Sequence, residues 1–355
     1  MSSMFKYQLP VEQTEWKING QSETCLTWEY DDGRESLLKL YAKGKKQQWD
    51  ADERIDWSQD LDPENPMLMP DETIRIFGSP MWEKMTEAER RRTRYHSQAW
   101  QISQFLHGEQ GALICTAKIV EQVLDLDAKF YAATQVMDEA RHVEAYSRLL
   151  HEKFELSYPM TPPLQALLNN VIEDSRWDFT YLGMQVMIEG LALAAFQAIR
   201  DLSRNPLAAA VNAYVMQDEA RHVAFGRFAL RDYYPQLTQA ERDEREDFVI
   251  EASYHMRDRF SAAEMWPVLG LPQQACVDWG EQSEGLRNFR TRLFSRIVPI
   301  IRDIGLWGPK VQSAYEKMGL LAYADTDTDA MLDADQKVAE EFDARRHVDQ
   351  IVGVS

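Results

Sequence analysis

The hexapeptide Asp138-Glu-Ala-Arg-His-Val143 recurs letter for letter as Asp218-Glu-Ala-Arg-His-Val223, 80 residues further along the chain. Six identical letters are more than a shared helical composition readily gives, so the repeat indicates two equivalent structural units. Within each copy, Glu-x-x-His places a carboxylate and an imidazole three residues apart, on one face of a helix and about one turn from each other. The two side chains can therefore bind one metal ion together.

A further glutamate lies 30 residues before the glutamate of each copy, because Glu109 precedes Glu139 and Glu189 precedes Glu219 by that distance. Thirty residues are enough for one helix, a turn and a second, antiparallel helix, so the two glutamates of each pair can lie at the same level along the helix axes. Packing two such helix pairs together brings four carboxylates and two imidazoles to one level of a four-helix core, the ligand set of dimetal carboxylate bundles. The predicted ligands are Glu109, Glu139, His142, Glu189, Glu219 and His222.

A lone Glu-x-x-His on a helix is more often a surface pair or a structural histidine. The duplication favours a metal site, because four carboxylates among apolar neighbours would be very costly to bury without a counter-ion. We expect Glu109, Glu139 and His142 to hold one ion and the remaining three residues to hold the other, with one or two carboxylates bridging. Mixed oxygen and nitrogen ligands favour iron or manganese over structural zinc or calcium.

The residues beside the ligands predict a supporting layer. Asp138 and Asp218 each precede a ligand glutamate, and each could accept the free ring N–H of the histidine in the other copy, which would fix its tautomer. Arg141 and Arg221 could neutralise these aspartates. The alternative is that all four residues form ordinary ion pairs along their own helices.

Composition excludes several classes of protein. The 355 residues include 39 Lys plus Arg against 58 Asp plus Glu, a net charge of −19, so nucleic acid and anionic membranes would repel the chain. The cysteines, Cys25, Cys115 and Cys276, lack the spacing of a thiolate zinc site or a disulfide framework, which favours a reducing compartment, the cytoplasm. The first residues lack the apolar core of a signal peptide, and no membrane-spanning segment is expected.

Glycine and proline are scarce, at 16 and 14 residues, and most prolines lie between long stretches of helical period. We therefore expect an all-α chain, with an N-terminal extension over 1–78, a four-helix bundle over 79–235 and further helices packed on it over 236–355. Residues 25–41 fit a hairpin, although the second arm equally suits a short helix. The predicted helices cover about 86–124, 128–156, 162–172, 179–202, 207–233 and 238–260.

Three hydroxyl residues are predicted to cap helices. Thr86 and Thr238 are each followed by glutamate at the third position, as in a capping box, and Thr161 precedes Pro162 at the start of the crossover helix. The acidic stretch 325–335 is expected to be a solvated loop.

Through these residues, the chain resembles the dioxygen-activating branch of the ferritin-like di-iron carboxylate superfamily. The duplicated motif is similar to that of multicomponent monooxygenase large subunits, and the whole arrangement is similar to the ribonucleotide reductase small subunit. The stretch Trp49-Asp-Ala-Asp-Glu-Arg-Ile-Asp56 resembles the N-terminal tryptophan segment of that subunit, which implies a place for Trp49 beside the ligands. Tyr146, four residues after His142, falls where its radical tyrosine would be.

The chain departs from each of these relatives. Leu193 stands where monooxygenase large subunits usually carry a threonine, and residues 345–355 contain no Tyr or Trp for long-range radical export. Acyl-carrier-protein desaturases match only at the ligands. Arylamine N-oxygenases have a similar size, but their extra histidine ligand has no obvious counterpart here.

The resemblance implies an oxygenase or oxidase that uses two iron ions, or a manganese–iron pair, and dioxygen on a small apolar or aromatic substrate. Leu113, Leu193, Phe196 and Tyr146 are expected to line its pocket, although core packing is the alternative and Tyr146 could instead store a radical. Without a dinucleotide-binding fingerprint, a ferredoxin or reductase would supply electrons. A homodimer is compatible with this reading. The competing functions are a radical-generating subunit and a ferritin-type metal-binding protein.

Overall fold

The computed structural model describes residues 17–20, 22–30 and 33–352, and within these residues it contains helices and no strand. The predicted all-α fold is therefore confirmed. Of the two alternatives left open for residues 25–41, the short helix is confirmed and the hairpin is not, because the second arm is α2 (Glu35–Lys46) and the described part of the first arm has no regular structure. The turn between the arms at 31–32, and the start of the chain examined for a leader, lie outside the described residues.

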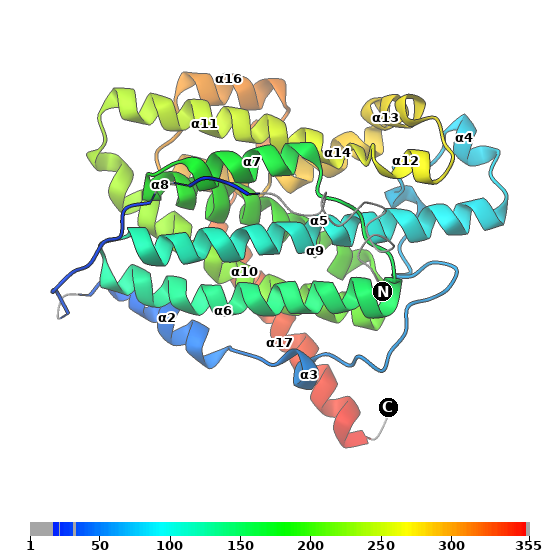
Figure 1. Cartoon of the computed structure of the whole chain (residues 1–355), viewed down its shortest axis with the longest axis horizontal. Coiled ribbons are helices and arrows are strands. Elements are labelled where there is room, and N and C mark those ends of the chain that lie inside the picture. Colours follow the sequence, from blue (N-terminus) through cyan, green and yellow to red (C-terminus); the bar gives the residue numbers. More distant parts are fainter. Residues whose placement is uncertain (1–16, 21, 31–32, 353–355) are drawn as a thin grey trace.

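Four long helical segments form the bundle and run along the long axis of the molecule (Figure 1). The helices α5 and α6 form one closely packed pair, and α9 and α10 form the other. These segments are α5 (Glu87–Gln122), α6 (Leu126–Arg148), the continuous stretch α8 (Trp177–Thr180), η4 (Tyr181–Ile188) and α9 (Glu189–Leu202), and α10 (Pro206–Tyr233).

Local sequence explains where these helices begin. Thr86 and Glu89 form the predicted capping box at the start of α5, with reciprocal side-chain and backbone hydrogen bonds. Asn205 caps α10 by accepting from the backbone N–H of Ala208, and Pro206 occupies the first helical position, where no N–H is needed. These signals fix the ends of the helices that carry the candidate ligands.

The third bundle segment differs from the other three because η4 is a π-helix inserted directly before Glu189. By length and composition, the stretch Trp177–Leu202 could cross a membrane. However, 78% of its most apolar 18-residue segment is buried inside the protein. Its position at the centre of the bundle accounts for that composition.

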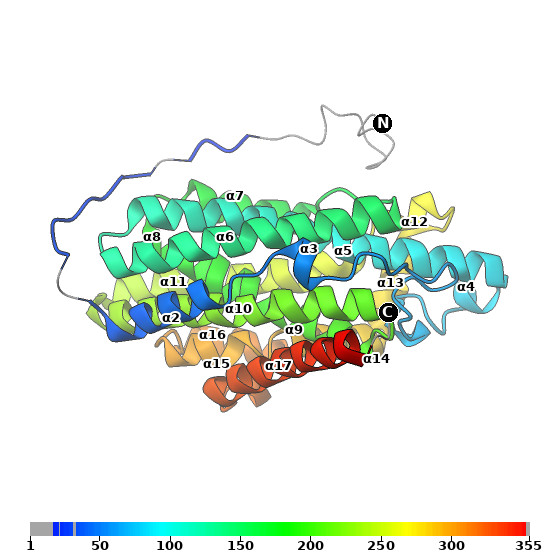
Figure 2. The same cartoon turned by 90° about the horizontal axis from the view of Figure 1, so that it is seen from below.

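Shorter helices cover the bundle. The helix α2 packs on α6 and α10, and α17 (Thr328–Val352) packs on α10, so both lie on one side (Figures 1 and 2). On the other side α7 (Pro162–Glu173) contacts α5 and α11 (Gln239–Asp258). The remaining elements are α3 (Ala51–Arg54), η2 (Asp71–Thr73), α4 (Pro80–Glu83), η3 (Leu149–Phe154), η5 (Tyr234–Gln236), η6 (Arg259–Ser261), α12 (Met265–Val268), α13 (Gln273–Gln282), α14 (Glu284–Leu293), α15 (Ile297–Asp303), α16 (Pro309–Lys317) and η7 (Leu321–Tyr323).

Two local expectations are wrong. Thr161 makes no capping hydrogen bond with its side chain, although Pro162 does begin α7. The acidic stretch 325–335 is not a loop throughout, because α17 begins at Thr328 and acidic residues are favoured near a helix N-terminus. Within it, Asp335 is buried and forms an ion pair of 2.8 Å with Arg296.

Candidate metal centre

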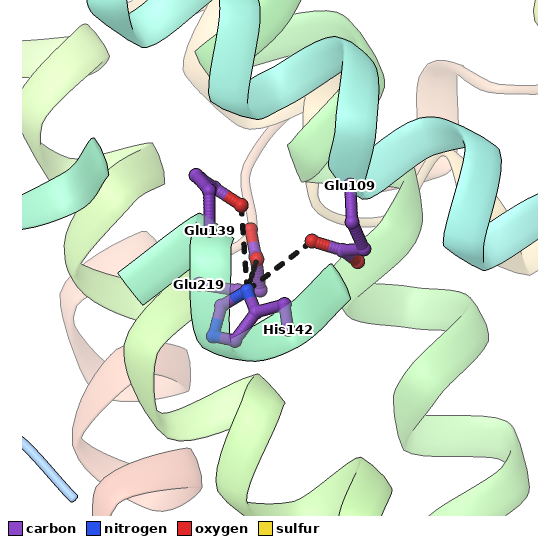
Figure 3. Close-up of side chains that lie close together, drawn as sticks. All are labelled: Glu109, Glu139, His142 and Glu219. Carbon is purple, nitrogen blue, oxygen red and sulfur yellow. Dashed lines mark hydrogen bonds and ion pairs between the residues drawn. The ribbon is translucent and has the colours of Figure 1, made fainter. Parts of the chain in front are cut away.

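All six predicted ligands meet at one level of the bundle. Glu109 comes from α5, Glu189 is the first residue of α9, and each remaining helix supplies one Glu-x-x-His pair. Each of the six side chains belongs to a residue that is at most 5% exposed. Three carboxylates point toward one imidazole in Figure 3, which draws Glu109, Glu139, His142 and Glu219.

The ligand atoms form two overlapping clusters. In the first, Nδ1 of His142 lies 3.0 Å from Oε1 of Glu219, 3.2 Å from Oε2 of Glu109 and 3.3 Å from Oε2 of Glu139 (Figure 3). In the second, Nδ1 of His222 lies 3.0 Å from Oε1 of Glu139, and Glu189 completes the group. Within each cluster the candidate donor atoms lie within 4.8 Å of one another, which suits one cation in each.

The glutamates of the two hexapeptides are the ones that reach both histidines. Glu139 belongs to both clusters. Glu219 contacts Nδ1 of His142 at 3.0 Å and Nδ1 of His222 at 3.5 Å. The expected division assigned Glu219 to the ion held by His222, whereas the structure groups it with His142. Glu139 and Glu219 are therefore the carboxylates with the geometry to bridge two ions.

The donor atoms of this centre fit a pair of cations. Both oxygens of Glu219 and one oxygen each of Glu139 and Glu189 are buried without a backbone, amide or guanidinium donor, and Glu219 contacts Nδ1 of the two histidines. A buried carboxylate oxygen without a partner is costly, and convergent oxygen and imidazole nitrogen atoms are the donors that iron and manganese prefer. Metal binding would satisfy these atoms and balance their charge.

Electrostatics at the centre reflect this crowding of charge. Burial, followed by repulsion from Glu219, raises the pKa of both Glu109 and Glu189 well above the ordinary value. Burial lowers the pKa of His142, but its contacts with Asp218 and with glutamates outweigh burial, so the pKa ends well above the ordinary value. Such shifts favour the protonated forms of these three groups, and metal binding would displace the protons.

The aspartates support the histidines in the crossed arrangement that the sequence predicts. Nε2 of His142 lies 3.2 Å from Oδ2 of Asp218, and Nε2 of His222 lies 3.2 Å from Oδ2 of Asp138. Each Asp thus accepts from the ring of the other copy and leaves Nδ1 directed at the glutamates.

The arginines of the motifs bind both aspartates. Arg141 donates to Asp138 at 2.5 Å and to Asp218 at 3.1 Å. Arg221 donates to Asp218 and, at 3.3 Å, to Asp138. The four residues therefore form a buried network between α6 and α10, and not only ion pairs along each helix.

The segment after α2 closes this network. Trp49 Nε1 donates to Asp218 at 2.8 Å, and Gln48 Nε2 donates to Asp138 at 2.7 Å. Gln47 accepts from Arg221 at 2.8 Å. The Trp49–Asp218 hydrogen bond agrees with the place beside the ligands that the resemblance implied for Trp49. The sequence analysis did not predict roles for Gln47 and Gln48.

Comparison with protein families identifies the chain. Residues 31–305, more than three quarters of its length, match the family described as P-aminobenzoate N-oxygenase AurF. The chain belongs to this AurF family. Its members are di-iron, ferritin-like oxygenases that use dioxygen, so the predicted superfamily, the oxidoreductase class and the dimetal cofactor are confirmed. No curated protein matches the chain.

The ligand set of this AurF-family chain contains two histidines. Within the described residues, the candidate clusters include His142 and His222 and no further imidazole. The histidines on α5 have other partners, because His96 contacts the hydroxyl of Tyr158 and His107 contacts the carbonyl of the same residue. The extra histidine ligand associated with arylamine N-oxygenases therefore has no equivalent in these clusters.

A cavity of about 20 Å³ adjoins the glutamates, with room for about one water molecule. Its walls are mainly apolar, and Glu109, Glu189 and Glu219 face it. The lining residues are Gln104, Phe105, Gly108, Glu109, Ala112, Ile188, Glu189, Leu191, Ala192, Phe196, Glu219, Arg259 and Phe260.

The expected pocket residues agree with this cavity only in part. Phe196 lines it, whereas Leu113, Leu193 and Tyr146 do not. The cavity adjoins Ala112 and Ala192, three residues after a ligand glutamate, and the next residue on each helix is rotated by about 100°. This rotation directs Leu193 into the fully buried core and leaves Leu113 half-buried outside the cavity wall.

Tyr146 packs behind the cavity. Its ring contacts Phe105 and Phe196, with ring centroids 5.8 Å and 5.7 Å away, and its hydroxyl donates to Oδ1 of Asn212 at 3.1 Å. Burial raises the pKa of Tyr146 well above the ordinary value. The phenol is therefore a neutral donor, hydrogen-bonded away from the metal ligands.

Gln135 is a functional residue that the sequence reasoning missed. Its amide nitrogen donates to Oε1 of Glu139 at 3.0 Å and to Oε1 of Glu189 at 2.9 Å. The sequence contained one signal for this role: a glutamine stands one helical turn before the ligand Glu139, where the second copy has the apolar Val215. This contact links Glu139 and Glu189, the two carboxylates of the cluster that contains His222.

Proposed function

We propose that the protein is a di-iron N-oxygenase that acts on a small aromatic amine. Membership of the AurF family is the observation that carries this proposal, and the buried pair of carboxylate–histidine clusters supports it. Phe105, Phe196 and Phe260 line the adjoining cavity with aromatic rings, which suit contact with a flat, largely apolar substrate once the cavity widens beyond its volume of about 20 Å³.

Iron at this centre would be held by Glu109, Glu139, His142, Glu189, Glu219 and His222, and it would supply the electrons that activate dioxygen. Conversion of an arylamine to its hydroxylamine takes up one oxygen atom and releases the other as water, with two electrons and two protons added. We propose a ferredoxin or flavin reductase as the external electron donor.

The residues of the chain have separate tasks in this proposal. Asp138 and Asp218 hold the histidine rings so that Nδ1 faces the centre, and Gln135 orients Glu139 and Glu189. The apolar walls exclude bulk water, which protects a reactive site from unproductive reduction. Glu219 faces the cavity and, unlike Glu139 and Glu189, receives no hydrogen bond from Gln135, so its carboxylate would be the less constrained ligand.

The test uses full-length protein loaded anaerobically with ferrous iron. We expect about two irons per chain, and we expect oxygen uptake with 4-aminobenzoate and a chemical reductant to yield 4-hydroxylaminobenzoate, detected by mass spectrometry. The Glu139→Ala variant should lose this product, and the control Glu144→Ala, a change at an exposed position on the same helix, should retain it. Iron far above two per chain, without an oxidised organic product, would instead support the ferritin-type function.

A further inference from the structure

The cavity beside the metal centre is lined by one basic side chain, Arg259, which has no role in the proposed function above. Arg259 lines it together with Glu109, Glu189 and Glu219. The residue is 5% exposed, and burial lowers its pKa to about 10, which still leaves the guanidinium charged at neutral pH. A buried charge of this kind normally requires a partner.

Arg259 has no carboxylate partner among the described residues. Its Nη1 approaches only the sulfur of Met256, at 3.9 Å, and its Nε has no acceptor. Every other buried arginine in the described chain forms an ion pair with Asp or Glu; these are Arg141, Arg200, Arg221, Arg227, Arg245, Arg290 and Arg296. The unpaired charge is therefore specific to the wall of this cavity.

A tight turn after α11 positions Arg259 at the cavity. The helix α11 ends at Asp258, Phe260 leaves helical geometry with φ −96° and ψ 20°, and buried Ala262 has a left-handed φ of 53°. A non-glycine residue in this region costs free energy and persists where the surroundings impose it. The resulting turn brings both Arg259 and Phe260 to the cavity.

A larger space lies close to the same residues. A pocket of about 650 Å³ is lined by Gln101 of α5 and Ala194 of α9, one turn or less from residues that line the small cavity. Phe289 in its wall contacts Phe260 edge to face, with ring centroids 5.5 Å apart. The two rings therefore connect the walls of the two spaces, and the proposal below requires the Phe260 ring to shift so that a substrate larger than water can enter.

We propose that Arg259 is a specificity-determining residue that binds a carboxylate on the aromatic substrate and thereby orients the ring beside the metal centre. This inference rests on the proposed function. The planar guanidinium matches a carboxylate in a two-bonded geometry, and a buried pair of this kind discriminates strongly against a neutral substituent. Glu109, Glu189 and Glu219 would not serve as the carboxylate partner of Arg259, because the two metal ions would balance their charge.

The experiment measures binding to iron-loaded, oxidised full-length protein by calorimetry, so no turnover is required. The probes are 4-aminobenzoate and the neutral 4-aminobenzamide. We expect the wild type to prefer the carboxylate by about 10- to 100-fold and the Arg259→Gln variant to lose that preference. The matched control Arg257→Gln removes a nearby guanidinium that is paired with Asp258 at the surface, and it should keep the preference.

Retention of the preference in Arg259→Gln, or no preference or no binding in the wild type, would overturn the role of Arg259. Should Arg259→Gln lose its iron or fail to fold, Arg259→Lys keeps the charge without the planar fork and should retain part of the preference. Metal content and oxygen uptake are measured separately. A protein that oxidises a neutral arylamine without discriminating charge would therefore refute this inference and leave the proposed function intact.

Discussion

In the first half of the repeat, Gln135 donates from one turn before the motif to Glu139 and Glu189, whereas the corresponding residue in the second half is buried Val215. Glu139 is thus held by a side-chain amide and does not line the cavity. Its counterpart Glu219 receives no side-chain amide hydrogen bond, contacts the two histidine rings, and does line the cavity. The comparison shows that an identical motif can place one glutamate under a side-chain amide and the other in the wall of the cavity.

The halves also differ in the position of their π-helices: η3 follows α6, after the ligand motif of the first half, whereas η4 lies directly before the ligand Glu189 of the second. The segment η4 brings Gln185 so close to α10 that a Cβ atom on Gly226 would lie 2.5 Å from the Cβ of Gln185. Tyr146 occupies the corresponding position in the first half, where α5 is an uninterrupted α-helix. The Tyr146–Gly226 difference therefore follows from packing, and it does not by itself argue for a radical at Tyr146.

The largest effect is expected from removing the carboxylates that reach both histidines. Glu139→Ala and Glu219→Ala should each reduce the iron content from about two ions per chain to below one, because Glu139 belongs to both clusters and Glu219 contacts both histidines. Elemental analysis after anaerobic loading measures this, with Glu144→Ala as the control. Unchanged iron in both variants would refute the dimetal assignment.

The next effect concerns the crossed aspartates. Asp138→Asn and Asp218→Asn should keep most of the iron under saturating conditions but weaken affinity or turnover by about 10- to 100-fold, the usual consequence of losing such support for a histidine ligand. Competition with a chelator gives the affinities. The two variants should behave alike, since both aspartates lie 3.2 Å from an imidazole nitrogen, and wild-type behaviour of either would reduce its role to an ion pair.

A smaller effect on iron binding is expected from changing Gln135, which has no equivalent in the second half of the repeat. Gln135→Leu removes the donor to Glu139 and Glu189 and should weaken binding of one of the two ions by about 10-fold. The control Gln122→Leu removes a buried glutamine that donates to the carbonyl of Ser175 instead. Stepwise iron titration separates the two ions, and equal affinities in Gln135→Leu and wild type would show that the asymmetry has no influence on binding.

The smallest effect belongs to Tyr146→Phe. Loss of the hydrogen bond to Asn212 should lower the free energy of unfolding by about 1 kcal/mol, measured by urea titration, and leave the iron content unchanged. We expect no stable tyrosyl signal in the electron paramagnetic resonance spectrum of the reduced wild type after exposure to oxygen. Such a signal, absent from Tyr146→Phe, would restore the radical role.

Sequence reasoning reached the six candidate ligands and the crossed Asp–His contacts because each is encoded twice, at a fixed spacing. It missed Gln135 because Val215 breaks the repeat there. It misplaced Leu193 because neighbouring positions on a helix differ by a rotation that only the packed bundle resolves. Arg259 lacked any signal, since its importance lies in the absence of a partner, which is a property of three-dimensional surroundings.

The crossed contacts also bear on how such a centre can arise. Because His142 relies on Asp218 and His222 relies on Asp138, neither copy of the motif supports its own histidine. A chain with a single copy could complete the pattern only by pairing face to face with a second chain, so that its metal affinity would rise and fall with protein concentration. Joining both copies in one chain replaces that association with an intramolecular one at a high effective concentration. The centre then assembles in a lone molecule, however dilute.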